Sequence, residues 1–156
     1  GRVLDVLERA LDGTHIEAQQ IWLEATERGF INVEAARATI EKARARGHAV
    51  AIDDFGTGYS SLSSLQNLPL DALKIDKSFV DTIGTDAATS SVTPHIIAMA
   101  RSLNMLIVAE GIETQQQADY LRERKVEFGQ GWLFAKALPA AEFLGFYATR
   151  RMPTST

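Results

Sequence analysis

Short apolar runs in this chain repeatedly end on acidic residues. The carboxylates follow four such runs, at Glu24, Asp53, Asp54, Asp76 and Glu110. The chain has no cysteine, and its three histidines share no metal-ligand spacing, so we assign the histidines to structure or surface. Carboxylate oxygens are the ligands that Mg²⁺ and Mn²⁺ prefer. Two such ions held close together are a standard arrangement for cleaving phosphodiesters, so these residue types favour a metal-dependent hydrolase.

The adjacent pair Asp53 and Asp54 is the most informative part of this pattern. At a strand end the chain turns, so both carboxylates can approach the same region, one bridging two ions and the other binding the second. Lys74 alternates with apolar residues, which predicts that it shares a strand face with Asp76 and can pair with that acid. A single strand-end acid has a simpler interpretation as a helix cap or a surface ion pair. Four such strand ends in one chain favour a common site.

Hydrophobic periodicity and turn residues predict five short strands that alternate with helices. The strands are expected near 20–23, 49–52, 72–75, 106–109 and 126–132. The helices are expected over 2–11, 33–46, 60–66, 94–103, 115–124 and 140–150, with Asn32 and Thr93 as N-caps and Thr114 with Gln117 as a capping box. The small, polar residues 81–91 are predicted to form a mobile loop.

Strands that alternate with helices predict an α/β protein with a parallel sheet. In a β/α barrel the carboxyl ends of the strands converge on one face, where active sites lie. We therefore predict a TIM-barrel-like (β/α) fold that gathers the five acids on that face. About five strand–helix units are too few for the usual eight. The prediction is a partial barrel, completed by an upstream part of the same barrel or by a partner chain, such as the second subunit of a homodimer.

The bulk composition is that of one folded domain. Of the 156 residues, 46% are hydrophobic, which suits a single compact core. The net charge of −4 argues against a binder of nucleic-acid polymers, which would need a basic surface. The lack of cysteine fits a cytoplasmic location. The chain opens on Gly1 and not on methionine, so we expect a longer parent protein, with any membrane attachment in segments outside this chain.

Several motifs occur together in a fixed order. The run DDFGTGYSSL covers 53–62, LPLD at 68–71 leads to LKID at 73–76, VAEGIET covers 108–114, and QG follows at 130–131. Upstream, LEATE covers 23–27. Over residues 21–138 this order resembles the EAL family of cyclic di-GMP phosphodiesterases, and ten consecutive matching residues make the resemblance specific. By this resemblance, residues 1–150 are the C-terminal portion of an EAL-type barrel domain and 151–156 are a tail.

The resemblance implies hydrolysis of one phosphodiester bond of cyclic di-GMP, which gives linear pGpG, with two Mg²⁺ or Mn²⁺ ions. Glu24 and Asp53 are similar to ligands of one metal. Asp53 is expected to bridge to the second ion, which Asp54 also binds. Glu110 resembles the family's catalytic glutamate, close to that second ion and to the attacking water, and it is the fourth expected metal ligand.

The resemblance also implies roles for four further residues. Lys74 resembles the lysine that orients the attacking water, with Asp76 supporting it. Glu27 is similar to the residue that steadies the loop after Asp54 and couples that loop to dimer formation. Gln130 resembles a polar contact to substrate in the site.

One departure from the family pattern leaves a second hypothesis open. The family's Glu-Ala-Leu motif and a downstream asparagine, both metal ligands, have no counterpart in this chain. The run at 34–36, Glu-Ala-Ala, is no substitute, because it follows Glu24 and lies on a predicted helix. The alternative is therefore a truncated, non-catalytic EAL-derived module that binds nucleotide or assembles with another chain.

Overall fold

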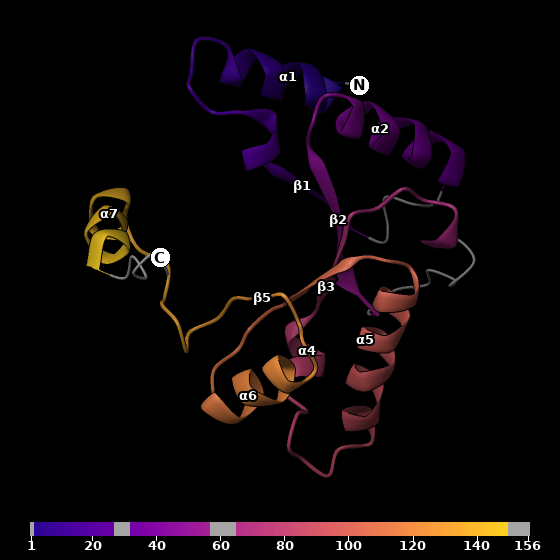
Figure 1. Ribbon diagram of the computed structural model, residues 1–156, viewed down its shortest axis with the longest axis vertical. Helices are drawn as coiled ribbons and strands as arrows, with labels where there is room; N and C mark the ends of the chain where they lie inside the picture. Colours follow the sequence, from indigo (N-terminus) through magenta and orange to yellow (C-terminus); the bar gives the residue numbers. More distant parts are fainter. Residues whose placement is uncertain (1, 27–31, 57–64, 150–156) are drawn as a thin grey trace, which may run out of the picture.

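A curled, five-stranded parallel sheet organises the chain (Figure 1). The computed structural model describes residues 2–26, 32–56 and 65–149. The strands pair in the order β1-β2-β3-β4-β5, with every pair parallel. Their bounds are β1 Trp22–Thr26, β2 Ala49–Phe55, β3 Ala72–Ile75, β4 Leu106–Ala109 and β5 Phe128–Gly129. The helices are α1 Arg2–Leu11, α2 Val33–Ala45, α4 Lys77–Val80, α5 Val92–Ser102, α6 Gln115–Glu123 and α7 Ala140–Thr149.

Local signals explain where two of these helices begin. The Asn32 side chain accepts a hydrogen bond from the Ala35 amide at the start of α2, as predicted for an N-cap. Thr114 and Gln117 form the predicted capping box of α6. The predicted strand at 126–132 is shorter in the structure, because only Val108 and Ala109 of the four-residue β4 pair with β5. The predicted helix at 60–66 falls mostly outside the described residues.

The segment between β3 and α5 differs from the prediction. A single helical turn, α4, follows β3 directly, and a 3₁₀ turn at Ala88–Ser91 interrupts the predicted loop. Thr93 is not the N-cap of α5, because the helix begins at Val92 with Ser91 in the cap position. The Thr93 side chain is fully buried and donates to the Phe79 carbonyl oxygen at 3.1 Å. A tertiary hydrogen bond has replaced the local one.

Side-chain alternation gives the sheet two distinct faces. On the outer face, Ile52, Leu73, Ile75 and Ile107 are fully buried in a core to which α2, α5 and α6 contribute. Because successive side chains of a strand point to opposite faces, the residues between these positions lie on the other, inner face.

The inner face shows that the sheet is strongly curled. Trp22 lies on β1 and Phe128 on β5, which are the two edge strands. Their rings nevertheless meet edge to face, with centroids 5.6 Å apart. A flat five-stranded sheet would separate its edges by about 19 Å at the usual strand spacing. The contact, together with the all-parallel order, confirms the predicted α/β partial barrel.

Apolar side chains stay accessible on the inner face of the sheet and on helix α7, among other places. On the inner face Trp22, Leu106 and Phe128 are more than one-third exposed. Helix α7 lies apart from the sheet in Figure 1, has no buried residue, and exposes apolar side chains that include Phe143 and Leu144. Within the described ranges, no helix combines the length and apolarity that crossing a membrane requires.

Candidate active site

Four side chains of the inner face converge at the carboxyl end of the sheet. The Lys74 ammonium on β3 lies 2.8 Å from Glu24 Oε2 on β1, 2.9 Å from Asp53 Oδ1 on β2 and 2.7 Å from Glu110 Oε1 after β4. Its side chain is only 7% exposed. One lysine therefore ties together the ends of three other strands.

The strand register brings these groups within two residues of Lys74 along their strands. Glu24 pairs with Ala51 in the β1–β2 ladder, two residues before Asp53 on the same face. Lys74 pairs with Val108, two residues before Glu110. The Glu110 amide donates to the Ile75 carbonyl oxygen at 3.1 Å, so the ladder continues past the end of β4 and holds Glu110 in line with the strand.

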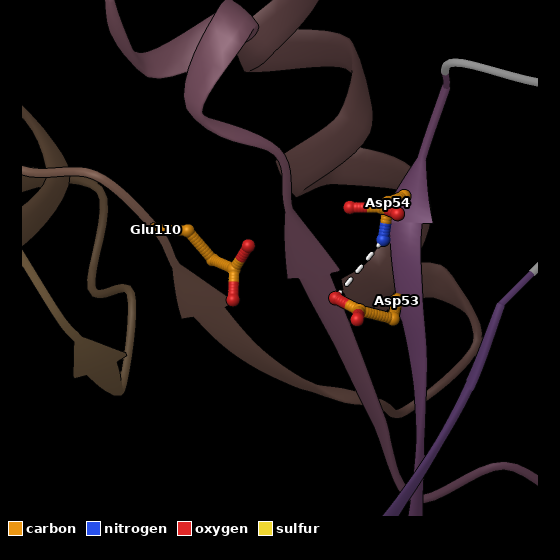
Figure 2. A group of neighbouring side chains, drawn as sticks. All are labelled: Asp53, Asp54 and Glu110. Carbon is orange, nitrogen blue, oxygen red and sulfur yellow. Dashed lines mark hydrogen bonds between the residues drawn. The ribbon is translucent and has the colours of Figure 1, made fainter.

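A strand irregularity allows both members of the aspartate pair to reach the site. In a regular strand, consecutive side chains point to opposite faces. The β2–β3 register shifts between Ile52 and Phe55, and Asp54 adopts a φ of +53°, a conformation that costs a non-glycine residue about 1–2 kcal/mol. The Asp54 amide donates to Asp53 Oδ1 at 3.1 Å. Figure 2 shows the two aspartates at the end of β2 facing Glu110.

These three carboxylates form a group that could hold a divalent cation. Asp53, Asp54 and Glu110 each offer an oxygen, and the three oxygens lie within 4.8 Å of one another. All the donors are carboxylate oxygens, which fits a hard cation of the Mg²⁺ or Mn²⁺ type. Glu24, the fourth predicted metal ligand, is half exposed and reaches this group through Lys74. We call Glu24, Asp53, Asp54 and Glu110, with Lys74 at their centre, the carboxylate cluster.

The cluster keeps Lys74 charged. Burial alone would lower the pKa of Lys74, but hydrogen bonds to Glu110, Glu24 and Asp53 outweigh it and raise the pKa above its usual value. The lysine is therefore a cation at neutral pH, and it offsets part of the negative charge of the three carboxylates that contact it.

Asp76 lies outside the carboxylate cluster. Its carboxylate caps α4, accepting from the Ser78 amide at 2.9 Å and from the Ser78 hydroxyl at 2.5 Å. The predicted pairing of Lys74 with Asp76 is wrong. The described ion pairs of Lys74 go to the three acids on neighbouring strands, because the chain has already turned into α4 at Asp76.

Gln130 lies beside the cluster, after β5. Its side-chain Nε2 donates to Glu110 Oε1 at 2.7 Å. Its backbone is held on both sides, since its amide donates to the Ala109 carbonyl at 2.9 Å and its carbonyl accepts from the Ile112 amide at 3.1 Å. The structure thus brings Gln130 to Glu110, whereas Glu27, the predicted loop-stabilising residue, lies outside the described residues.

Replacing Gly131 with alanine should destabilise the chain by about 3 kcal/mol, the upper end of the range for overpacking. A Cβ at this position would lie 2.7 Å from the Ile112 carbonyl carbon and against its amide nitrogen and oxygen. Backbone atoms of a paired strand end cannot move aside as a side-chain tip can. Urea unfolding measures the effect, and Gly145→Ala is the matched control, because nothing lies within 4 Å of its Cβ position. Equal stability of the two variants would contradict this close approach.

One residue near the site was recognised in the sequence only for a local role. Gln117 is buried, and its Oε1 accepts from the amides of Glu113 and Thr114 at 2.8 and 2.9 Å. Its Nε2 donates to the Val80 carbonyl at 3.3 Å. The capping-box spacing predicted the bond to Thr114. The link to α4 spans 37 residues and has no local sequence signal.

Comparison with known proteins identifies the family of the chain. The EAL domain family matches residues 2–137. The probable cyclic di-GMP phosphodiesterase PdeB of Escherichia coli K12 is 48% identical over 143 residues, which cover 92% of this chain and 27% of that protein. The cyclic di-GMP phosphodiesterase NbdA of Pseudomonas aeruginosa is 43% identical over 149 residues, covering 93% and 19% respectively. The chain thus spans about a quarter or less of the length of these relatives.

Solved structures give the same result. A PaMucR phosphodiesterase in complex with c-di-GMP superposes with a TM-score of 0.83 at 36% identity, covering 90% of this chain and 57% of that one. The EAL domain of Mycobacterium smegmatis DcpA gives 0.86 at 35% identity, covering 96% and 67%. The family expected from the motifs is confirmed: the chain belongs to the EAL domain family.

Proposed function

We propose that the chain works in the cytoplasm, within a complete EAL barrel, as a metal-dependent phosphodiesterase that hydrolyses cyclic di-GMP to linear pGpG. The observation that carries the proposal is the carboxylate cluster. Asp53, Asp54 and Glu110 present three oxygens to one space, and Lys74 places an ammonium at its edge. The names of the relatives support the substrate, since PdeB and NbdA are described as cyclic di-GMP phosphodiesterases.

The charge of the cluster supports a need for metal ions. Three carboxylates contact the Lys74 ammonium, and Asp54 adds a fourth beside Asp53 and Glu110, so this cluster without a bound cation would repel a phosphodiester. Glu24, Asp53, Asp54 and Glu110 would hold two Mg²⁺ or Mn²⁺ ions. When bound, such ions supply positive charge for the phosphate and make water a stronger acid.

The remaining chemistry belongs to side chains of this chain. In the proposed mechanism, Glu110 accepts the proton of the attacking water, and the Lys74 ammonium donates a hydrogen bond that orients this water. Asp76 supports Lys74 indirectly, because its cap fixes the start of α4 just beyond β3. Gln130 holds the Glu110 carboxylate through its amide and contacts the substrate beside it.

Assembly is part of the proposal. The inner face exposes Trp22, Leu106 and Phe128, and in the described chain β1 and β5 are the sheet edges. Exposed apolar surface beside strand edges favours association. We propose that an upstream part of the same barrel covers this face and supplies the metal ligands that the chain lacks, or that a second copy covers it in a homodimer. If neither does, the chain is a non-catalytic module that binds nucleotide or another protein.

The test incubates the purified 156-residue chain, and a longer polypeptide that carries the whole barrel, with cyclic di-GMP and Mn²⁺. Chromatography separates the nucleotides, and light scattering gives the mass of each preparation. We expect pGpG from the whole barrel, none after chelation of Mn²⁺, and none from Asp53→Asn. The exposed loop variant Asp86→Asn is the control. Nucleotide bound without pGpG in either preparation would favour the non-catalytic module, and activity of a dimeric 156-residue chain would favour the homodimer.

A further inference from the structure

Lys77, which has no role in the mechanism above, connects α4 with the turn that follows Glu110. Its ammonium lies 2.7 Å from Asp81 Oδ1 on one side and 3.0 Å from Glu113 Oε1 on the other. The first contact is an i,i+4 pair that steadies the lysine. The second crosses from the strand end of β3 to the strand end of β4.

The Lys77 stem lies directly over Gly111. Gly111 adopts a φ of +67°, and a Cβ at this position would lie 2.7 Å from both Cβ and Cδ of Lys77. A side chain at position 111 would therefore displace the Lys77 side chain at the atoms closest to the Lys77 backbone. The Lys77 stem thus packs on Gly111, the residue after Glu110, and its ammonium pairs with Glu113 two residues further along the chain.

Hydrogen bonds to other elements hold the rest of this turn. The Glu110 amide donates to the Ile75 carbonyl and the Ile112 amide donates to the Gln130 carbonyl. Gln117 accepts from the Glu113 amide and reaches Val80 of α4. On the side of β3, the ion pair of Lys77 with Glu113 links the turn to the start of α4, three residues after Lys74.

We propose that Lys77 is a positioning residue for Glu110: by clamping Gly111 and Glu113 to α4, it sets the place of the Glu110 carboxylate relative to Lys74 and Asp53. Its consequence for catalysis rests on the proposed function, but its effect on the turn and on metal affinity does not. Lys77 is 45% exposed, and exposed ion pairs contribute little to global stability. Loss of this ion pair should therefore change the local geometry of the turn after Glu110 and leave the urea unfolding midpoint almost unchanged.

The test compares Lys77→Met, which keeps the stem and removes the charge, with Lys77→Arg, which restores the charge. The control is Arg37→Met, which removes an exposed i,i+4 pair with Glu41 on α2, away from the site. Four quantities are measured: Mn²⁺ affinity by electron paramagnetic resonance, amide hydrogen exchange of residues 110–114, kcat and KM in the active preparation, and the urea midpoint.

For Lys77→Met we expect about tenfold weaker Mn²⁺ binding, the size typical of losing a group that orients a metal ligand. We also expect faster exchange at 110–114, and about tenfold lower kcat with KM unchanged. Lys77→Arg should recover most of each loss, and Arg37→Met should show none. A second variant, Gly111→Ala, displaces the stem from the opposite side and should reproduce the weaker Mn²⁺ binding.

Unchanged exchange and Mn²⁺ affinity in Lys77→Met would overturn the proposal. So would losses that Lys77→Arg does not repair and that come with a lower urea midpoint, because these describe a general structural role. If the wild-type protein makes no pGpG in any preparation, the proposed function fails. Exchange and Mn²⁺ affinity would then still decide the role of Lys77.

Discussion

Replacing Glu110 with glutamine is expected to lower the rate of cyclic di-GMP hydrolysis by about 10²–10⁴-fold, the usual contribution of a positioned general base. Glutamine keeps the shape of the side chain but can neither accept the proton of the attacking water nor carry a charge. Glu110 is well suited to that role by position, since it lies among the cluster oxygens and is held by both Lys74 and Gln130 at 2.7 Å.

The structure indicates that Glu110→Gln lowers the rate of hydrolysis without unfolding the chain. In Glu110→Gln, Lys74 keeps its contacts to Glu24 at 2.8 Å and to Asp53 at 2.9 Å, so the loss of stability should be small beside the loss of rate. The measurement is the rate of pGpG formation at saturating substrate, with circular dichroism to verify folding. Glu123→Gln, at the end of α6, is the control and should keep full activity. A rate within about tenfold of wild type would exclude Glu110 as the base.

Side-chain periodicity predicted the fold, and the strand-end positions predicted four of the five acids that were expected to gather, with Asp76 outside the cluster. Alternation within a strand places Glu24, Asp53, Lys74 and Glu110 on one face, and a parallel sheet brings strand ends together. The structure has both features. The match over residues 2–137 confirms the family. The catalytic and metal-binding roles of these residues remain predictions.

The features that sequence could not supply depend on contacts between distant residues. Lys74 pairs with acids on three other strands, and not with Asp76 two residues away, because the stagger of the strands decides which carboxylates reach it. The Trp22–Phe128 contact joins residues at opposite edges of the sheet, and it depends on how far the sheet curls. No local sequence pattern encodes the stagger of the strands or the curl of the sheet.

Thr93 shows how a local pattern can mislead. A threonine before a proline is a typical helix start, and the prediction of an N-cap followed from it. In the folded chain the same hydroxyl is buried and satisfies a carbonyl of α4. Burial of a polar side chain requires such a partner, so the long-range bond prevailed over the cap.

Replacing Lys74 with methionine is expected to have opposite effects on stability and on metal affinity. Without the ammonium, Glu24, Asp53 and Glu110 face one another with no compensating charge. Breaking such a buried pair costs about 3–5 kcal/mol, so we expect the metal-free variant to be less stable by about 3 kcal/mol. The same carboxylates, freed from a neighbouring cation, should bind Mn²⁺ at least about tenfold more tightly, since like charges a few ångströms apart repel by more than about 1.4 kcal/mol near a protein surface.

The two effects can be read from one pair of urea titrations, with and without Mn²⁺. Mn²⁺ at about 100 times its dissociation constant stabilises a protein by about 2.7 kcal/mol, so a fixed Mn²⁺ concentration should raise the unfolding midpoint more in Lys74→Met than in wild type. Hydrolysis should nevertheless fall, because the variant lacks the group that orients the attacking water. Lys42→Met, on the exposed side of α2, is the control and should change neither quantity.

The pH dependence of the Lys74→Met effect follows from the raised pKa of Lys74. A basic group with a raised pKa in the folded state contributes its full stability below its unfolded pKa of about 10.5, and this contribution is lost only as the pH rises through the folded value. The difference between wild type and Lys74→Met should therefore stay constant from about pH 6 to pH 9. A difference that shrinks across this range would mean that Lys74 loses its proton within the cluster. The ammonium could then not be the fixed charge that holds the three strand ends together.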